Sequence, residues 1–172
     1  IPDLGSLLQP LKEAISNLLI PALTEGRHVS VDERVLLSLP PRLGGMGIIA
    51  PTRTCQQEFT FSKIATNMLT SAICEQQHDL PPNFTEQCKT TRAEIRSKRR
   101  ADQSEVLEDL RSRMTPVESR INDINCETGA SIWLTTLPIE EKGFSLTKRE
   151  FWDTVHLRYG WTLPRLPSKC AC

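Results

Sequence analysis

Apolar residues recur at three- and four-residue intervals through most of this chain, and that spacing constrains the fold more than any other feature. Side chains three or four positions apart share one face of an α-helix. One stripe runs through residues 11–22, and another runs through a helix predicted from Thr52 to about Gln77, namely Phe61, Ile64, Ala65, Met68, Leu69, Ala72 and Ile73. No convincing hairpin signal interrupts the pattern. The sequence therefore predicts an all-α fold, an irregular multi-helix bundle with one long charged helix and a Pro-rich extended C-terminal tail.

Capping signals mark where these helices begin and end. A Ser or Thr followed three residues later by Glu can form a capping box, in which each side chain accepts a hydrogen bond from the other residue's backbone N–H. Such boxes predict helices that begin after Ser30, Thr115 and Thr147. Pro21 is expected to kink or end the first long helix, and Gly160 is expected to cap the last one.

A glycine-rich block follows the second predicted helix. Gly44, Gly45 and Gly47 fall within four residues, directly after Pro40-Pro41. Glycine is used where the backbone takes a left-handed conformation or where another chain segment approaches closely. We therefore expect a turn or short irregular strand here.

Composition sets limits on what this chain can do. Its 21 Lys and Arg balance 21 Asp and Glu, which excludes a globally basic nucleic-acid binder but not a local basic patch. A hydrophobic fraction of 38% allows only a modest core. No apolar run approaches the roughly 18 residues of a membrane helix, so no membrane partner is expected. Four of the six cysteines are scattered singly through predicted helices, and no signal-peptide pattern opens the chain, so we expect reduced thiols in the cytoplasm or nucleus.

The strongest functional signal is a basic stretch in the long charged helix predicted from about Thr85 to Met114. Within this stretch the only acidic residue is Glu94. The six cations are Lys89, Arg92, Arg96, Lys98, Arg99 and Arg100. Such a cluster can bind phosphates with release of counterions, and Arg42 is a weaker candidate for the same role. The alternative is a solvated charged helix, because Glu105, Glu108 and Asp109 follow closely. No aromatic residue lies among the cations, so base stacking from this segment is not expected.

Catalytic and metal-binding motifs are sparse. The sequence has no Walker-type loop, no nucleophile elbow and no His-Glu-x-x-His pattern, so we expect no catalytic residue in this chain. Cys170 and Cys172 are spaced to hold one edge of a metal ion, but a tetrahedral zinc site needs two further ligands. They form half a zinc site, and only if the natural chain continues past Cys172. No cofactor is expected within the chain itself.

Two blocks of sequence resemble parts of a known family. Residues 20–24 and 36–48, the latter ending in Leu-Gly-Gly-Met-Gly-Ile, are similar to the segment just after the polymerase core of retrotransposon reverse transcriptases. Residues 129–146, followed by Phe-Trp-Asp at 151–153 and Leu-Arg-Tyr-Gly-Trp at 157–161, resemble the linker of animal retroelement polyproteins that precedes a Cys/His zinc knuckle.

The resemblance implies a division into a thumb-like helical region at 1–80, a charged helical connector at 81–115 and a helical linker at 116–172. The catalytic Tyr-x-Asp-Asp pattern of the polymerase is absent. The chain would therefore be a non-catalytic fragment of an RNA-directed DNA polymerase. It would hold the RNA or DNA backbone of the template–primer beside an upstream polymerase core and link it to a zinc-knuckle region.

A rival hypothesis needs no nucleic acid. In that interpretation the chain is a helical protein–protein interaction module, and an exposed apolar stripe of the charged helix docks a partner helix. The stripe consists of Val106, Leu107, Leu110 and Met114. Salt dependence separates the two hypotheses, because phosphate contacts weaken steeply with salt and apolar docking does not.

Overall fold

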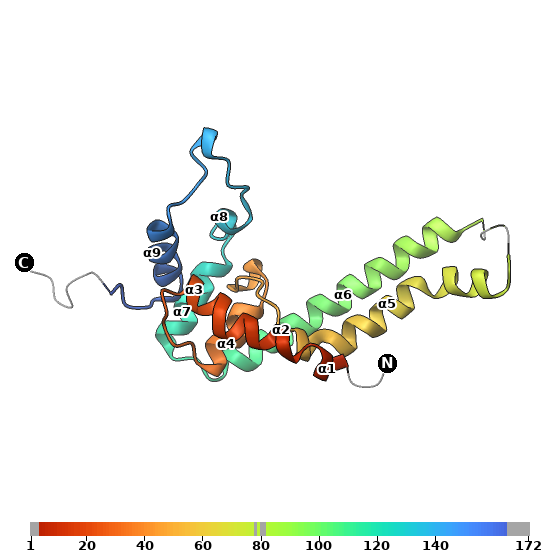
Figure 1. Ribbon diagram of the computed structural model, residues 1–172, viewed down its shortest axis with the longest axis horizontal. Coiled ribbons are helices and arrows are strands. Elements are labelled where there is room, and N and C mark those ends of the chain that lie inside the picture. Colours follow the sequence, from red (N-terminus) through yellow and green to blue (C-terminus); the bar gives the residue numbers. More distant parts are fainter. Residues whose placement is uncertain (1–3, 78, 80–81, 165–172) are drawn as a thin grey trace, which may run out of the picture.

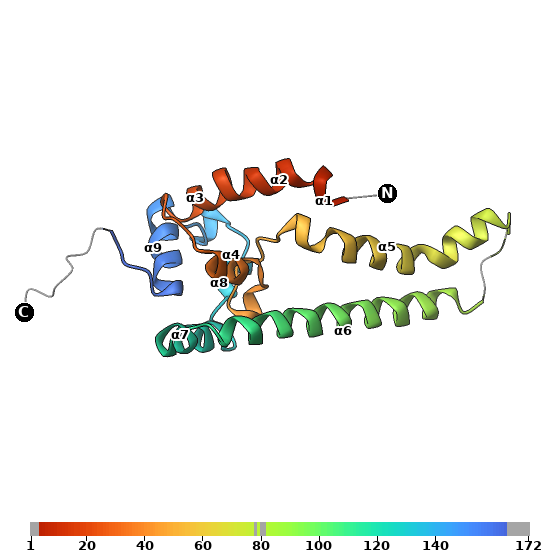
Figure 2. The same ribbon diagram turned by 90° about the horizontal axis from the view of Figure 1, so that it is seen from below.

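The computed structural model describes residues 4–77, 79 and 82–164, and within those ranges the fold is all-α with no strand. A long two-helix hairpin extends from a compact helical body, and the N-terminal helices lie along the base of the hairpin (Figures 1 and 2). The hairpin consists of α5 (Pro51–Cys74) and α6 (Phe84–Arg111). None of the helices in the described part of the chain is long and apolar enough to cross a membrane.

The N-terminal segment is one nearly continuous helical stretch. It comprises α1 (Leu4–Leu7), α2 (Gln9–Ala14), a π-helical turn over Ile15–Leu19 and α3 (Ile20–Leu23). Pro21 does not end the helix where it stands, since α3 continues for two more residues. A proline inside a helix has no N–H to donate, and its ring crowds the preceding turn. The π-helical turn over Ile15–Leu19 lies directly before Pro21, so the helix is distorted there and not ended.

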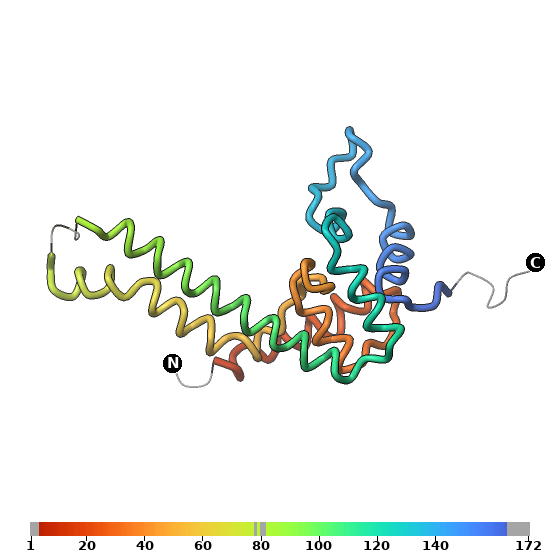
Figure 3. The backbone as a smooth tube through the Cα atoms, turned by 180° about the vertical axis from the view of Figure 1, so that it is seen from behind, coloured from red at the N-terminus to blue at the C-terminus, as the bar shows by residue number. Residues whose placement is uncertain are grey.

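The body is built from short helices whose starts follow the predicted caps. These helices are α4 (Val31–Ser38), α7 (Pro116–Cys126), α8 (Ile132–Thr135) and α9 (Lys148–Tyr159). All three predicted capping boxes are confirmed: Ser30 pairs with Glu33, Thr115 with Glu118, and Thr147 with Glu150. Gly160 caps α9 in the left-handed conformation, as predicted. Between α7 and α9, a loop that carries α8 and a 3-10 turn at Glu140–Lys142 projects from the body (Figures 1 and 3).

Two small apolar clusters hold the body together. The first joins α3, α4 and α9 through Ile20, Leu37, Val155 and Tyr159, with Trp133, Phe151 and Trp161 packed around them. The second joins the end of α4 to the end of α6 through Leu39, Leu107 and Leu110. Residues of α4 thus contribute to both clusters, and this short helix connects the hairpin to the body.

The glycine block packs against the end of α4. Pro41–Leu43 form a 3-10 turn, and Gly44 ends it with a φ of 84°. Gly45 approaches so closely that an added Cβ would lie 1.9 Å from the Leu39 carbonyl oxygen. The expectation of unusual backbone angles or close chain approach is therefore confirmed at Gly44 and Gly45.

Two apolar stripes are used differently from expectation. On α5, only Phe61 and Ala72 are buried from the predicted stripe, whereas Ile64, Leu69 and Ile73 are exposed, because α6 covers only a narrow strip of this helix. On α6, the stripe of the rival hypothesis is not free. Its members Leu107 and Leu110 are buried, and Val106 and Met114 pack beside them.

The predicted three-region division stays a prediction. Its first boundary separates α5 from α6, yet these two helices pack against each other and form one arm. The Pro-rich tail was predicted after Trp161. Residues 161–164 are not helical, and the remainder of the tail lies outside the described residues.

Candidate nucleic-acid interface

The basic stretch lies on the distal and middle part of α6. There the helix packs on α5 through Ile95, the one residue of the basic stretch with an apolar side chain to bury. Asp102 accepts a hydrogen bond from Gln57 and so fixes the register of the two helices nearer the body. All six predicted cations are exposed on this hairpin.

Charge is segregated around α6. Each helical residue advances by about 100°, so five of the six cations fall within an arc of about 100°. These five, which we call the basic flank, are Lys89, Arg92, Arg96, Arg99 and Arg100. Most acidic residues of the helix fall on the opposite side, namely Glu94, Asp102, Glu105, Glu108 and Asp109. Glu86, near the tip, is the exception and falls about 40° outside the arc. The basic flank extends for about 17 Å along the helix axis. Lys98 is the one cation of the basic stretch that falls outside this arc, on the same side of α6 as the acidic residues.

Part of this charge is already engaged. Arg99 forms a bidentate ion pair with Glu58 of α5, and its guanidinium lies 5.3 Å from the centre of the Phe61 ring. Lys89 lies 3.5 Å from Glu86, a solvent-exposed pair of the kind that contributes little. The side chains of Arg92, Arg96 and Arg100 form no ion pair with any residue in the described ranges. These three arginines remain available to an anion.

A shallow groove of about 300 Å³ runs between α5 and α6 at this point. Arg92, Arg96 and Arg99 line its α6 side, and Glu58 and Ser62 line its α5 side. Because Glu58 is paired with Arg99, the formal charge of the groove is that of the two unpaired arginines. The hairpin therefore presents two guanidinium groups side by side at the rim of a concave surface, a geometry suited to phosphate oxygens.

Arg42 belongs to the same surface. Its Nη2 atom donates a 2.5 Å hydrogen bond to Oε1 of Gln103, and Gln103 falls within the arc of the basic flank. The turn at Pro41–Leu43 thus places Arg42 at the body end of the flank, although 61 residues separate the hydrogen-bonded pair. Sequence reasoning had no signal for this proximity, nor for the contacts of Phe61 with Lys98 and Arg99.

The other predicted site, Cys170 and Cys172, lies outside the described residues. Within those residues no group of three or more His, Cys, Asp or Glu side chains is placed to hold a metal ion. The cysteines that the structure describes, Cys55, Cys74, Cys88 and Cys126, are free thiols. Burial is the largest influence on Cys126 and raises the pKa of its thiol, which disfavours the reactive thiolate.

Sequence analysis did not identify a buried cation that organises the body. Arg158 of α9 donates from Nη2 to Ser131 Oγ at 2.9 Å, and to the carbonyl oxygens of Gly45 and Pro41 at 3.3 and 3.4 Å. Asn125 of α7 donates to the Arg158 carbonyl at 2.6 Å. This arginine therefore ties α9, α7 and the glycine turn together, and its role is structural.

No protein-family model matches this chain, and neither a curated protein nor a solved structure does. The functional argument therefore depends on the charges and contacts described above.

Proposed function

We propose that this chain is a non-catalytic nucleic-acid-binding region that grips a phosphate backbone with the basic flank of α6. The observation that carries the proposal is the set of unpaired, exposed guanidinium groups of Arg92, Arg96 and Arg100 on one side of the hairpin. Arg42 extends the surface toward the body. Segregation of acidic residues to the opposite side of α6 favours this interpretation over an evenly solvated charged helix, since an even mixture would cancel the local field.

The chemistry of the surface suggests what kind of contact it makes. Arginine binds phosphate oxygens through paired N–H donors, and such contacts position a nucleic acid without reading its sequence. The flank carries no aromatic side chain among its cations, so the bases would not be stacked here. We infer that binding is sequence-independent and steeply salt-dependent.

The resemblance of residues 36–48 and 129–146 to retroelement reverse transcriptases supports a more specific version. In that version the chain holds the template–primer next to the polymerase core of the same polyprotein. The rival interaction-module hypothesis loses its assigned surface, because Leu107 and Leu110 are buried within this chain.

The test is a titration of the chain with a short RNA–DNA hybrid duplex at several salt concentrations. A triple variant, R92Q/R96Q/R100Q, removes the three unpaired guanidinium groups. Each lost phosphate contact lowers the slope of log affinity against log salt by about 0.9, so the slope should fall by about 2 to 3. The affinity at low salt should fall at least about tenfold.

The matched control is K12Q/R120Q/K142Q, which removes the same charge from exposed positions on α2, α7 and the projecting loop. It should leave the slope nearly unchanged. Equal slopes for both triple variants would mean that binding reflects total charge only, and a wild-type slope near zero would overturn the proposal.

A further inference from the structure

An exposed apolar stripe runs along the N-terminal helical segment, residues 4–23. Its members are Leu7, Leu11, Ala14 and Leu18, and we call them the leucine stripe. Their spacing of four, three and four residues places them on one side of a helix, over about 17 Å of its axis. The three leucines are 67%, 50% and 71% exposed, and Ala14 is exposed as well.

Other residues of the segment make its contacts with the rest of the chain. Ile15 and Ile20 pack in the first apolar cluster, and α1 packs against α5. The segment runs along the edge of the molecule, with α5 between it and α6 (Figure 2). No described part of the chain buries the leucine stripe, so its apolar side chains face solvent.

Charge is almost absent from this segment. Lys12 and Glu13 are the only charged residues among residues 4–23, whereas charged residues make up 24% of the whole chain. At about 100° per residue, the two fall about 130° from the middle of the leucine stripe, one on each side. A helix face that stays in water normally carries charged side chains, and this one carries none. A second identical stripe would therefore meet no like charge.

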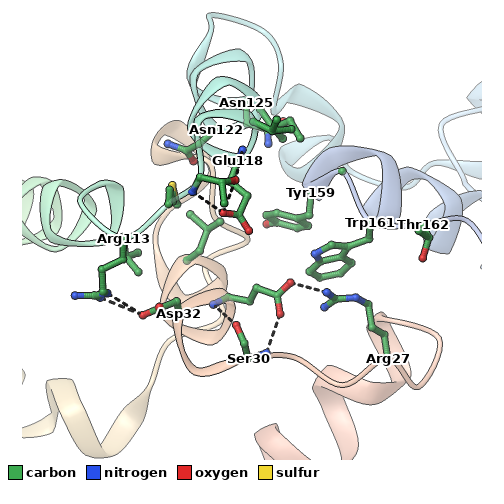
Figure 4. Close-up of a pocket in the computed structure, with 18 residues that line it drawn as sticks. Arg27, Ser30, Asp32, Arg113, Glu118, Asn122, Asn125, Tyr159, Trp161 and Thr162 are labelled. Atoms are coloured by element: carbon green, nitrogen blue, oxygen red, sulfur yellow. Dashed lines mark hydrogen bonds and ion pairs between the residues drawn. The ribbon is translucent and has the colours of Figure 1, made fainter.

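The largest cavity of the body is a poor surface for the same kind of contact. It measures about 610 Å³ and opens between α4, α7 and the ends of α6 and α9, with Tyr159 in its wall (Figure 4). Arg27 and Arg113 at its rim are paired with carboxylates, but Glu118 forms no ion pair within the described ranges. In a two-fold contact each copy would bring this charged rim against the same rim.

We propose that the leucine stripe pairs with the leucine stripe of a second copy of this chain, with the two helical segments antiparallel. Spacings of three and four residues are those of the seam between paired helices. A two-fold axis midway along the stripe places position 7 opposite position 18, and position 11 opposite position 14. Leu11 then meets an alanine, so a large side chain packs against a small one. A parallel pair would instead leave a gap between two alanines.

The size of the stripe sets the strength of this pairing. Four side chains from each copy bury less than the about 1,200 Å² that marks the lower end of stable interfaces. The dimer should therefore be weak, with a dissociation constant between about 10 µM and 1 mM. The chain should be monomeric in dilute solution and increasingly dimeric as its concentration rises.

Sedimentation velocity of the full chain across that concentration range tests the proposal. L7E/L18E puts two carboxylates of each copy into the seam and should weaken dimerisation at least about tenfold. The matched control L137E/L157E changes two leucines that are 74% and 66% exposed elsewhere, and it should leave the dissociation constant unchanged. Circular dichroism should show that both variants stay folded, because all four positions are exposed. Leu11→Ala, which preserves helix propensity, should also weaken dimerisation about tenfold.

The proposal is overturned if the wild-type chain stays monomeric at about 1 mM, or if L7E/L18E and L137E/L157E give equal dissociation constants. R92Q/R96Q/R100Q should dimerise as wild type does. Dimerisation and nucleic-acid binding can therefore fail independently of each other.

Disulfide trapping tests the antiparallel arrangement. The native cysteines all follow residue 54, and trypsin cleavage after Lys12 and Arg27 separates peptide 1–12 from peptide 13–27. An equimolar mixture of L7C and L18C is oxidised, digested and analysed by mass spectrometry. The antiparallel pair should join peptide 1–12 of one copy to peptide 13–27 of the other. Absence of that link, or a dominant link between two copies of peptide 1–12, would overturn the arrangement.

Discussion

Replacing Gly45 with alanine tests the packing of the glycine turn most directly. The new Cβ would lie 1.9 Å from the Leu39 carbonyl oxygen and 2.6 Å from that of Leu36. Both are backbone atoms at the end of α4, so neither can rotate aside as a flexible side chain would. Contacts shorter than 3.0 Å essentially never occur for a real Cβ, so the two segments must separate by about 1 Å.

The cost follows from what that separation breaks. Residues 45–48 donate four backbone hydrogen bonds of 2.8 to 3.3 Å to the end of α4 and the two residues after it. The acceptors are the carbonyl oxygens of Leu37, which accepts two, Leu39 and Pro40. Losing two or three of them, at about 0.5–1.5 kcal/mol each, and loosening Met46 and Ile48 from the first apolar cluster should together cost about 3–5 kcal/mol. That is a large share of the stability of a typical domain, about 5–15 kcal/mol.

Urea denaturation followed by circular dichroism measures this cost. Gly47→Ala is the matched control, because Gly47 has a φ of 74° but its added Cβ meets nothing closer than 4.0 Å. Its cost should be only the left-handed backbone strain, about 1–2 kcal/mol. Extrapolated free energies of unfolding scatter by about 1 kcal/mol. If the free energies of unfolding of Gly45→Ala and Gly47→Ala differ by less than this, the close approach of Gly45 to Leu39 is wrong.

Three further results are expected. Tyr159 is the single tyrosine of the chain, so its ultraviolet absorbance should titrate near pH 12 in the native state and near pH 10 in urea. Because folding raises this pKa, the contribution of Tyr159 to stability should be complete below about pH 10 and lost as the pH rises through about 12. A titration midpoint near pH 10 for the native protein would contradict the burial of Tyr159. Thr115→Ala should lower stability by about 1 kcal/mol in urea through loss of the α7 cap, whereas the exposed Val117→Ala should have almost no effect. Arg158→Gln should cost about 2–4 kcal/mol because several hydrogen bonds of a buried cation are lost, and the exposed Arg120→Gln should cost nearly nothing; similar midpoints for both would refute the structural role of Arg158.

The candidate interface was predicted only in part. The six cations of the basic stretch were identified from composition, and all of them are exposed on α6. Their availability was not predictable, because Glu58 and Phe61 come from α5, about 40 residues earlier. The cavity at Tyr159 gave no sequence signal either, since its lining comes from four separate helices and the segments around them.

The sequence by itself determined where three of the helices begin and where α9 ends. The three capping boxes, the left-handed Gly160 cap and the glycine turn depend on neighbours within a few residues, so local chemistry was sufficient. Only the tertiary structure decided which faces are covered. Leu107 and Leu110 are buried because α4 lies against them, while Ile64 and Ile73, in an equally apolar stripe, stay exposed because α6 covers only part of α5. Burial depends on partners distant in sequence, and a periodic pattern specifies a face without specifying what meets it.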